Sequence, residues 1–216
     1  MTYQTLPRSV SDAKYLVFHK GGVTEFLVNQ QIGGGTWVYL GTFEFDKGTN
    51  DYGMVVLSNE SRQKGVVCAD AVRFGGGMGN ILRGGKTSGL PRYLEGARYA
   101  AQWSGFPYPV YSPSESKNDY TDDINARSRI INYLSGNSVY NPKEKGLGVP
   151  FEMTLGVHSD AGFSKEDDLV GTLGIYTTDY NNGELNAGIS RYASRDLADM
   201  VLTGLQRDIS AQFGIR

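Results

Sequence analysis

The feature that most constrains the fold is a change in the spacing of apolar residues near residue 80. Before it, short runs alternate apolar and polar residues, as in KYLVFH and TWVYLGTFEF. After it, apolar residues recur every three or four positions, as in SRYASRDLADMVLTGL. Alternation is typical of strands, and the longer period is typical of amphipathic helices. A glycine-rich segment, 75–89, separates the two patterns, so we predict two domains, residues 1–78 and 79–216.

The N-terminal domain contains several strand-like runs between Lys14 and Phe74. Turn signals separate these runs at residues 21–22, 33–35 and 47–50. No helical period interrupts them, and the chain is rich in glycine and tyrosine, with 29 and 14 residues respectively. Glycine turns between aromatic and β-branched runs favour antiparallel β structure. Residues 1–78 are therefore predicted to form an antiparallel β meander or sandwich.

The C-terminal domain alternates predicted helices with apolar strands. The helices span residues 88–105, 120–136 and 190–213, and the strands span 151–158 and 169–178. This alternation indicates an α/β layer structure. An open sheet usually has about four to six strands, so we expect this domain to be incomplete. The fold class is thus α+β, a β-sandwich-like module followed by an α/β layer domain.

Composition argues against two classes of partner. The net charge is -2 and the pI is about 5.7, and no local cluster of lysine and arginine stands out, so we expect no nucleic-acid partner. No apolar run approaches the roughly 20 residues that span a bilayer, and the start MTYQTLPRSV lacks the regions of a signal peptide. We therefore expect a soluble chain. The single cysteine, Cys68, allows no internal disulfide.

One of the two histidines, His158, ends an apolar alternating run and is followed directly by Ser-Asp-Ala-Gly. Glu152 shares its predicted face, but six strand residues separate the two by about 20 Å. Ser159 and Asp160 do not complete a hydrolase triad with it, because neighbouring side chains diverge. Two interpretations remain: a structural histidine at a strand end, or a metal ligand whose partners come from another element.

The best such partner by pattern is Glu95, at the edge of the apolar face of the helix PRYLEGARYAAQW. A catalytic zinc site needs about three protein ligands, and a helical glutamate is a suitable one. The alternative is an exposed carboxylate paired with Arg92 or Arg98 at a spacing of three. Spacing alone favours that alternative.

The runs YLVFHKGGVTEFLVNQQ, GGGTWVYLGTFEF, VVLSN and VVCADAVRF closely resemble the golvesin C-terminal-like domain, also known as the carbohydrate-binding domain of proteins labelled xanthan lyase. The resemblance covers residues 14–74. Its members have further strands upstream of a run like TYQTLPRS, so we expect this domain to be incomplete. The resemblance implies glycan binding.

An aromatic row offers a place for that binding. Trp37, Tyr39, Phe43 and Phe45 share one face of a predicted strand, and exposed rings on such a face can stack on sugars. Trp37 is the candidate carbohydrate-binding residue. The alternative is that the row fills the core, as large aromatics usually do, and alternation favours it.

Residues 86–213 resemble zinc-dependent N-acetylmuramoyl-L-alanine amidases in which a golvesin module is inserted. The motifs are LPRYLEGARY, DDINARSRIINYL, TLGVHSDAG and GTLGIY. The resemblance implies that Glu95 and His158 bind zinc and that Arg127 and Asp160 bind substrate. The family's first histidine ligand and its catalytic glutamate have no counterpart here. We therefore expect a fragment with an incomplete amidase-like layer domain, weak zinc binding, unidentified catalytic residues and no activity of its own.

The implied reaction is cleavage of the amide between N-acetylmuramic acid and L-alanine. The implied partner is peptidoglycan or another bacterial polysaccharide, and the implied location is extracytoplasmic. Two alternatives stay open. One is a non-catalytic glycan-binding module. The other is a polysaccharide lyase of the xanthan lyase type, which needs a base and a charge neutraliser in a cleft, and nothing in the sequence orders the tyrosines into such a set.

Overall fold

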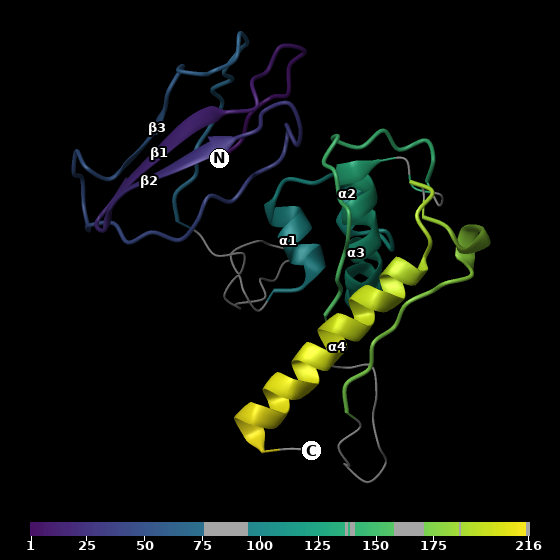
Figure 1. Ribbon diagram of the computed structural model, residues 1–216. Helices are drawn as coiled ribbons and strands as arrows, with labels where there is room; N and C mark the ends of the chain where they lie inside the picture. Colours follow the sequence, from purple (N-terminus) through teal and green to yellow (C-terminus); the bar gives the residue numbers. More distant parts are fainter. Residues whose placement is uncertain (76–94, 137, 139–140, 158–170, 186, 215–216) are drawn as a thin grey trace. The chain divides into compact units, whose positions relative to one another are not determined.

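The computed structural model describes residues 1–75, 95–136, 138, 141–157, 171–185 and 187–214. Contacts divide the chain into two compact units, Met1–Thr154 and Leu155–Arg216. The boundary predicted at residues 78 and 79 lies inside the first unit and outside the described residues, so it stays a prediction. The chain combines a small sheet with helices (Figure 1). No helix in the described ranges has both the length and the apolar character needed to cross a membrane.

The sheet has three antiparallel strands, β1 Ala13–His19, β2 Gly22–Val28 and β3 Met54–Leu57. β1 and β2 form a hairpin whose turn needs Gly22, because its φ of 119° is accessible mainly to glycine. The strand order is β2-β1-β3. The sheet is antiparallel as predicted, but the meander was wrong, because β3 pairs with β1 and not with β2.

The core of the first unit lies on one face of β1. Ala13, Tyr15 and Val17 are buried and alternate with half-buried neighbours, as the period of two requires. Met1, Tyr3 and Val10 join Ala13 and Tyr15 in one apolar cluster. Half-buried side chains packed against this cluster are Phe26, Val28, Val38, Leu40, Val55, Leu57, Val67 and Cys68.

Residues 36–45 and 66–74, both predicted as strands, form none in the structure. The backbone N–H of Trp37 donates to the carbonyl of Ser104, and that of Val38 donates to the carbonyl of Met1. The second segment makes only isolated bridges, at Val66 and Ala71. These hydrogen bonds go to scattered partners and build no ladder. Within the described residues no second sheet faces the first, so the sandwich stays a prediction.

The described part of the first unit also contains the helices α1 Ala97–Trp103, α2 Tyr108–Tyr111 and α3 Asp119–Ser135. The helix predicted over 120–136 is confirmed; Asn118 caps its start, and Gly136, with a φ of 74°, ends it. Glu95 and Gly96 precede α1, so the prediction that Glu95 lies on this helix was wrong. Gly96 is extended and acts as the N-cap, so the helix begins only after it.

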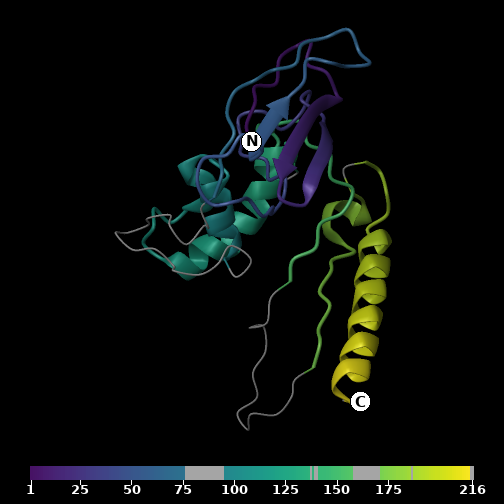
Figure 2. The ribbon, with the colours of Figure 1, turned by 90° about the vertical axis from the view of Figure 1, so that its left-hand side faces the viewer.

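The second unit contains the 3-10 helix η3 Tyr180–Gly183 and the helix α4 Tyr192–Phe213. The predicted long helix is confirmed, but none of its residues is fully buried, and Met200 of its apolar stripe is 74% exposed. Residues 171–178 lie beside α4 (Figure 2), with Gly174 in reach of Ala198 and Leu202. Neither this segment nor residues 151–157 form a strand. Within the described residues neither segment pairs with a strand, so their apolar pattern builds no ladder there, and the α/β layer stays a prediction.

Candidate functional site

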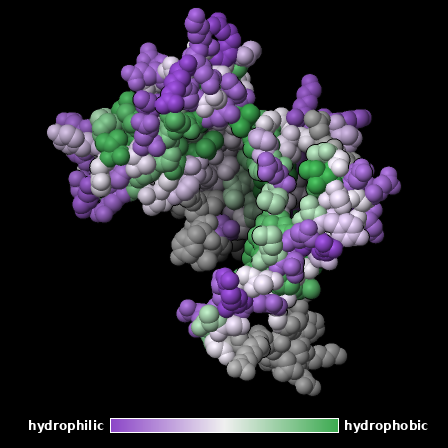
Figure 3. Space-filling model, in the orientation of Figure 1, coloured by the Kyte–Doolittle hydropathy of each residue, from purple (hydrophilic) through white to green (hydrophobic). Residues whose placement is uncertain are grey.

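The first unit contains a cavity of about 380 Å³, which we call the aromatic cavity. Its walls come from the segments that follow β2 and β3, from β1 and from the end of α1. Its lining residues are Met1, Val17, Trp37, Val38, Tyr39, Leu40, Gly41, Thr42, Phe43, Phe45, Val55, Val72, Arg73, Phe74, Gly75 and Trp103. Figure 3 shows apolar surface over this strand-containing part of the chain.

The predicted aromatic row lines this cavity. Trp37, Phe43 and Phe45 are half-buried, and Tyr39 is 48% exposed. The row is therefore neither a closed core nor a flat exposed face. Phe45 meets Phe74 edge to face, with ring centroids 5.3 Å apart, which is a favourable aromatic geometry.

Arg73 supplies the only charged side chain among the lining residues that the structure describes. Its Cζ lies 4.0 Å from the ring centroid of Trp37 and 5.2 Å from that of Trp103. Both distances are within the range of a cation–π contact. Burial and then the Arg73 charge lower the pKa of the Met1 amino group. The cavity thus combines aromatic faces with positive charge.

Backbone contacts from the end of α1 position the two tryptophans. The Trp37 N–H donates to the Ser104 carbonyl at 2.9 Å, one residue after Trp103. Gly105 follows with a φ of 78°, and a Cβ there would lie 3.4 Å from the Trp37 ring. The glycine predicted to end this helix therefore also lets the indole approach closely.

Of the residues that the amidase resemblance selects, Glu95 lies just before the start of α1, and Arg127 lies in the middle of α3. Glu95 is half-buried and directly precedes Gly96. A Cβ on Gly96 would lie 2.5 Å from Oδ1 of Asp123, and that oxygen accepts from the Arg98 backbone N–H at 3.0 Å. Arg127 pairs with Oδ2 of the same Asp123 at 3.3 Å. Asp123 therefore links the start of α1 to Arg127 on α3.

The other two residues of that set, His158 and Asp160, lie outside the described residues. In the parts of the chain that the structure covers, no group of three or more histidine, cysteine, aspartate or glutamate side chains could hold a metal ion. Glu95 is thus the one predicted zinc ligand with a described position.

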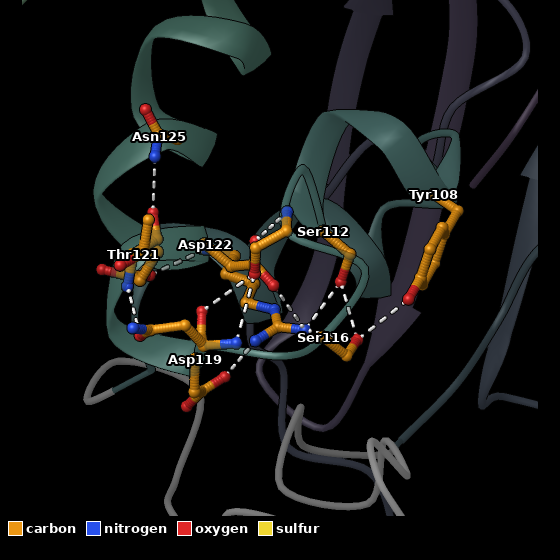
Figure 4. A network of polar contacts seen from close by, with 11 residues as sticks. Tyr108, Ser112, Ser116, Asp119, Thr121, Asp122 and Asn125 are labelled. Carbon is orange, nitrogen blue, oxygen red and sulfur yellow. Dashed lines mark hydrogen bonds and ion pairs between the residues drawn. The ribbon is translucent and has the colours of Figure 1, made fainter.

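A buried polar network, absent from the sequence-based predictions, joins the three helices of the first unit (Figure 4). Arg98 is 1% exposed. Its guanidinium pairs with Asp119 and with Asp122, and it donates to the hydroxyls of Ser112 and Ser116. The network joins α1 to α2 and α3, so we assign it a structural role, although Nε of Arg98 and Oδ2 of Asp122 are buried and make no hydrogen bond within the described residues.

Asp122 is fully buried at the centre of this network. Burial alone would raise the pKa of its carboxyl, but hydrogen bonds from Ser114 and the charge of Arg98 outweigh it, and the pKa is lowered. The Ser114 N–H donates to Oδ1 at 2.6 Å, and Arg98 lies 3.3 Å from Oδ2. The carboxylate is therefore held in its charged form.

Sequence reasoning missed Arg73 and Trp103 as cavity residues. Arg73 stood inside an apolar run, VVCADAVRF, and Trp103 closed the apolar face of a helix. The available signal was that Trp103 is one of only two tryptophans in the chain. Nothing in the spacing brings it to Trp37.

No curated protein and no solved structure matches the chain, but one family model matches its N-terminal part. The family model described as the Golvesin C-terminal domain matches residues 1–76, a span that contains the whole sheet and every lining residue of the aromatic cavity except Trp103. The sheet-containing part of this chain is therefore similar to the Golvesin C-terminal domain.

Proposed function

We propose that the golvesin-like part of the chain is a carbohydrate-targeting module that binds a glycan in the aromatic cavity. The observation that carries the proposal is the gathering of two tryptophans, one tyrosine and three phenylalanines around an open cavity of about 380 Å³. The C–H faces of sugar rings pack on aromatic rings, and ligand sites are typically concave and mostly apolar with a few polar groups. The similarity to the Golvesin C-terminal domain supports this use.

The exposure of side chains that line the aromatic cavity favours a binding surface over a packing defect as the explanation of the cavity. Tyr39, Val72 and Phe74 are 48%, 42% and 51% exposed although they line the cavity together. Clustered exposed apolar side chains mark interaction sites in soluble proteins. A sugar packed on these rings would remove their surface from water.

Glycan binding by the purified chain tests the proposal. Oligosaccharides that score on a glycan array are titrated while tryptophan fluorescence is followed. Trp37→Ala should weaken binding by about 30-fold, as expected for loss of an aromatic anchor worth about 2 kcal/mol. Tyr52→Ala is the matched control, because Tyr52 is 81% exposed and lies outside the cavity lining. Equal affinity of the Trp37→Ala and Tyr52→Ala variants would remove the cavity as the site.

Our second proposal concerns the residues that follow the golvesin-like part. We propose that they belong to a zinc amidase that cleaves the N-acetylmuramoyl-L-alanine bond of peptidoglycan in an extracytoplasmic setting. Its support is the link through Asp123, which brings the start of α1, next to Glu95, towards Arg127. Glu95 and His158 would hold the metal, and Arg127 and Asp160 would bind substrate. Bound zinc would supply an activated water.

The zinc proposal is tested by titrating Zn²⁺ into the purified chain by calorimetry. We expect weak zinc binding, which weakens further in Glu95→Gln and in His158→Ala. We also expect no muramyl-peptide cleavage, because the family's first histidine ligand and its catalytic glutamate have no counterparts in this sequence. Glu60→Gln, at an exposed glutamate paired only with Lys14, is the control. Cleavage that disappears in His158→Ala would contradict the expected inactivity, and zinc binding indifferent to both substitutions would remove the site.

A further inference from the structure

The aromatic cavity carries a positive charge that the binding of a neutral sugar would not require. Among the described residues of the lining, Arg73 is the one charged side chain, and none is an aspartate or glutamate. A cation that no described carboxylate of the lining neutralises lowers the energy of an anionic ligand at contact distance, although water partly screens the charge of the exposed Arg73. Charge complementarity therefore selects among the glycans that the aromatic rings would accept.

The donors of Arg73 are available to such a ligand. A guanidinium carries five N–H donors in one plane. Within the described residues, its recorded contacts are the ring faces of Trp37 and Trp103, at 4.0 and 5.2 Å from Cζ, and no oxygen atom accepts from it. The rings hold the guanidinium in place, while its N–H edges have no acceptor among the residues that the structure describes.

The guanidinium fork matches a planar carboxylate, which it binds through two parallel hydrogen bonds. We propose that the aromatic cavity recognises an acidic glycan, with the carboxylate of a uronic-acid residue on Arg73 and an adjoining sugar face on Trp37. This inference rests on the proposed glycan binding and narrows its ligand class. Trp103 is a positioning residue in this arrangement, because it holds the arginine.

The test compares each acidic oligosaccharide with its own carboxyl-reduced form. Oligosaccharides of polygalacturonate, alginate and glucuronoxylan are titrated calorimetrically into the whole chain at low and at high salt. We expect at least one acidic form to bind about tenfold more tightly than its reduced counterpart, with a preference that shrinks at high salt. Arg73→Gln should remove that preference, and Arg73→Lys should keep part of it, since lysine retains the charge but not the fork.

Arg62→Gln is the matched control, because it removes an equal charge from an exposed arginine outside the cavity lining. Thermal unfolding of each variant confirms that it is folded. If acidic and reduced forms bind equally well and Arg73→Gln changes neither, the acidic-glycan inference fails while glycan binding stands. If no acidic oligosaccharide binds, the acidic-glycan inference also fails. The proposal that the aromatic cavity binds glycans is then decided by whether neutral glycans on the array bind and whether that binding depends on Trp37.

Discussion

Gln30 shows how a single polar side chain organises the first unit. It is fully buried. Its amide nitrogen donates to the Cys68 carbonyl at 2.9 Å and to the Tyr15 hydroxyl at 3.2 Å, and its amide oxygen accepts from the Cys68 N–H at 2.8 Å. The side chain therefore satisfies both backbone polar groups of Cys68, which belong to no strand. Burial raises the pKa of Tyr15, so its phenol stays protonated.

We predict that Gln30→Met lowers the free energy of unfolding by about 2–4 kcal/mol, because it strands the N–H and the carbonyl of Cys68, and an unsatisfied buried group costs roughly 1–3 kcal/mol. Urea unfolding followed by circular dichroism measures the change. Gln31→Met is the control, since Gln31 is exposed and its side chain can be replaced at little cost. An equal effect of the two substitutions would contradict the role of Gln30.

At the scale of single residues, the sequence predicted that four aromatic residues lie together and missed the contact between Arg73 and Trp37. The aromatic row was recognisable because Trp37, Tyr39, Phe43 and Phe45 are separated by even spacings along one run, and the structure brings all four to one cavity. Arg73 reaches Trp37 from a distant part of the chain. Such contacts depend on the path of the connecting segments, on which local periodicity carries no information.

Among the elements, α3 was the most predictable, because its start and end both carry local signals. The side-chain oxygen of Asn118 accepts from the Thr121 N–H at 3.0 Å, which satisfies one of the free N–H groups of the first turn. Gly136 ends the helix with a positive φ. Both residues act through neighbours a few positions away, and the sequence shows those neighbours directly.

The cap gives a prediction at the element scale. Asn118→Ala should lower the free energy of unfolding by about 1 kcal/mol, whereas Asn118→Asp should leave it within a few tenths, because aspartate caps as well as asparagine does. Thermal and urea unfolding of both variants measure the difference. A loss of the same size in the two variants would show that the amide group and not the capping oxygen matters.

The network around Arg98 gives α3 a pH dependence. The folded-state pKa of Asp122 is lowered, below the value of about 3.9 that aspartate has in an unfolded chain. The stability from this carboxylate is therefore complete above that unfolded value and is lost as pH falls through the folded-state pKa.

We predict that Asp122→Asn costs about 3 kcal/mol at pH 7, because it leaves the buried Arg98 with a weakened partner. The cost should shrink as pH falls from about 4, where the carboxyl of the unfolded wild-type chain takes up a proton, through the lower pKa of the folded state. Urea unfolding across pH measures both, with Asp51→Asn at an exposed position as the control. A cost that stays constant from pH 7 to low pH would contradict the assignment.

For the whole molecule, the sequence predicted the kinds of elements better than their pairing. Alternation places the apolar side of β1 correctly, but β3 pairs with β1 across a long connection. Residues 36–45 alternate as clearly as β1 does and still form no strand, because their backbone groups bond to Met1 and Ser104. A periodic pattern states which face is apolar. It does not state which strand supplies the hydrogen bonds.

The division of the chain after Thr154 gives the last prediction. The sheet, the apolar cluster around Tyr15 and the Arg98 network all lie within residues 1–154. Within the described part of 155–216, α4 has no fully buried residue, and Met200 and Phe213 are 74% and 68% exposed. A helix whose packed face is only half-buried gains little stability from tertiary contacts, and a helix without such contacts is marginal in water. Residues 1–154 expressed alone should therefore unfold cooperatively near the melting temperature of the full chain, and residues 155–216 alone should show no cooperative transition by circular dichroism. Loss of the transition in 1–154 would show that the first unit depends on the second for its stability.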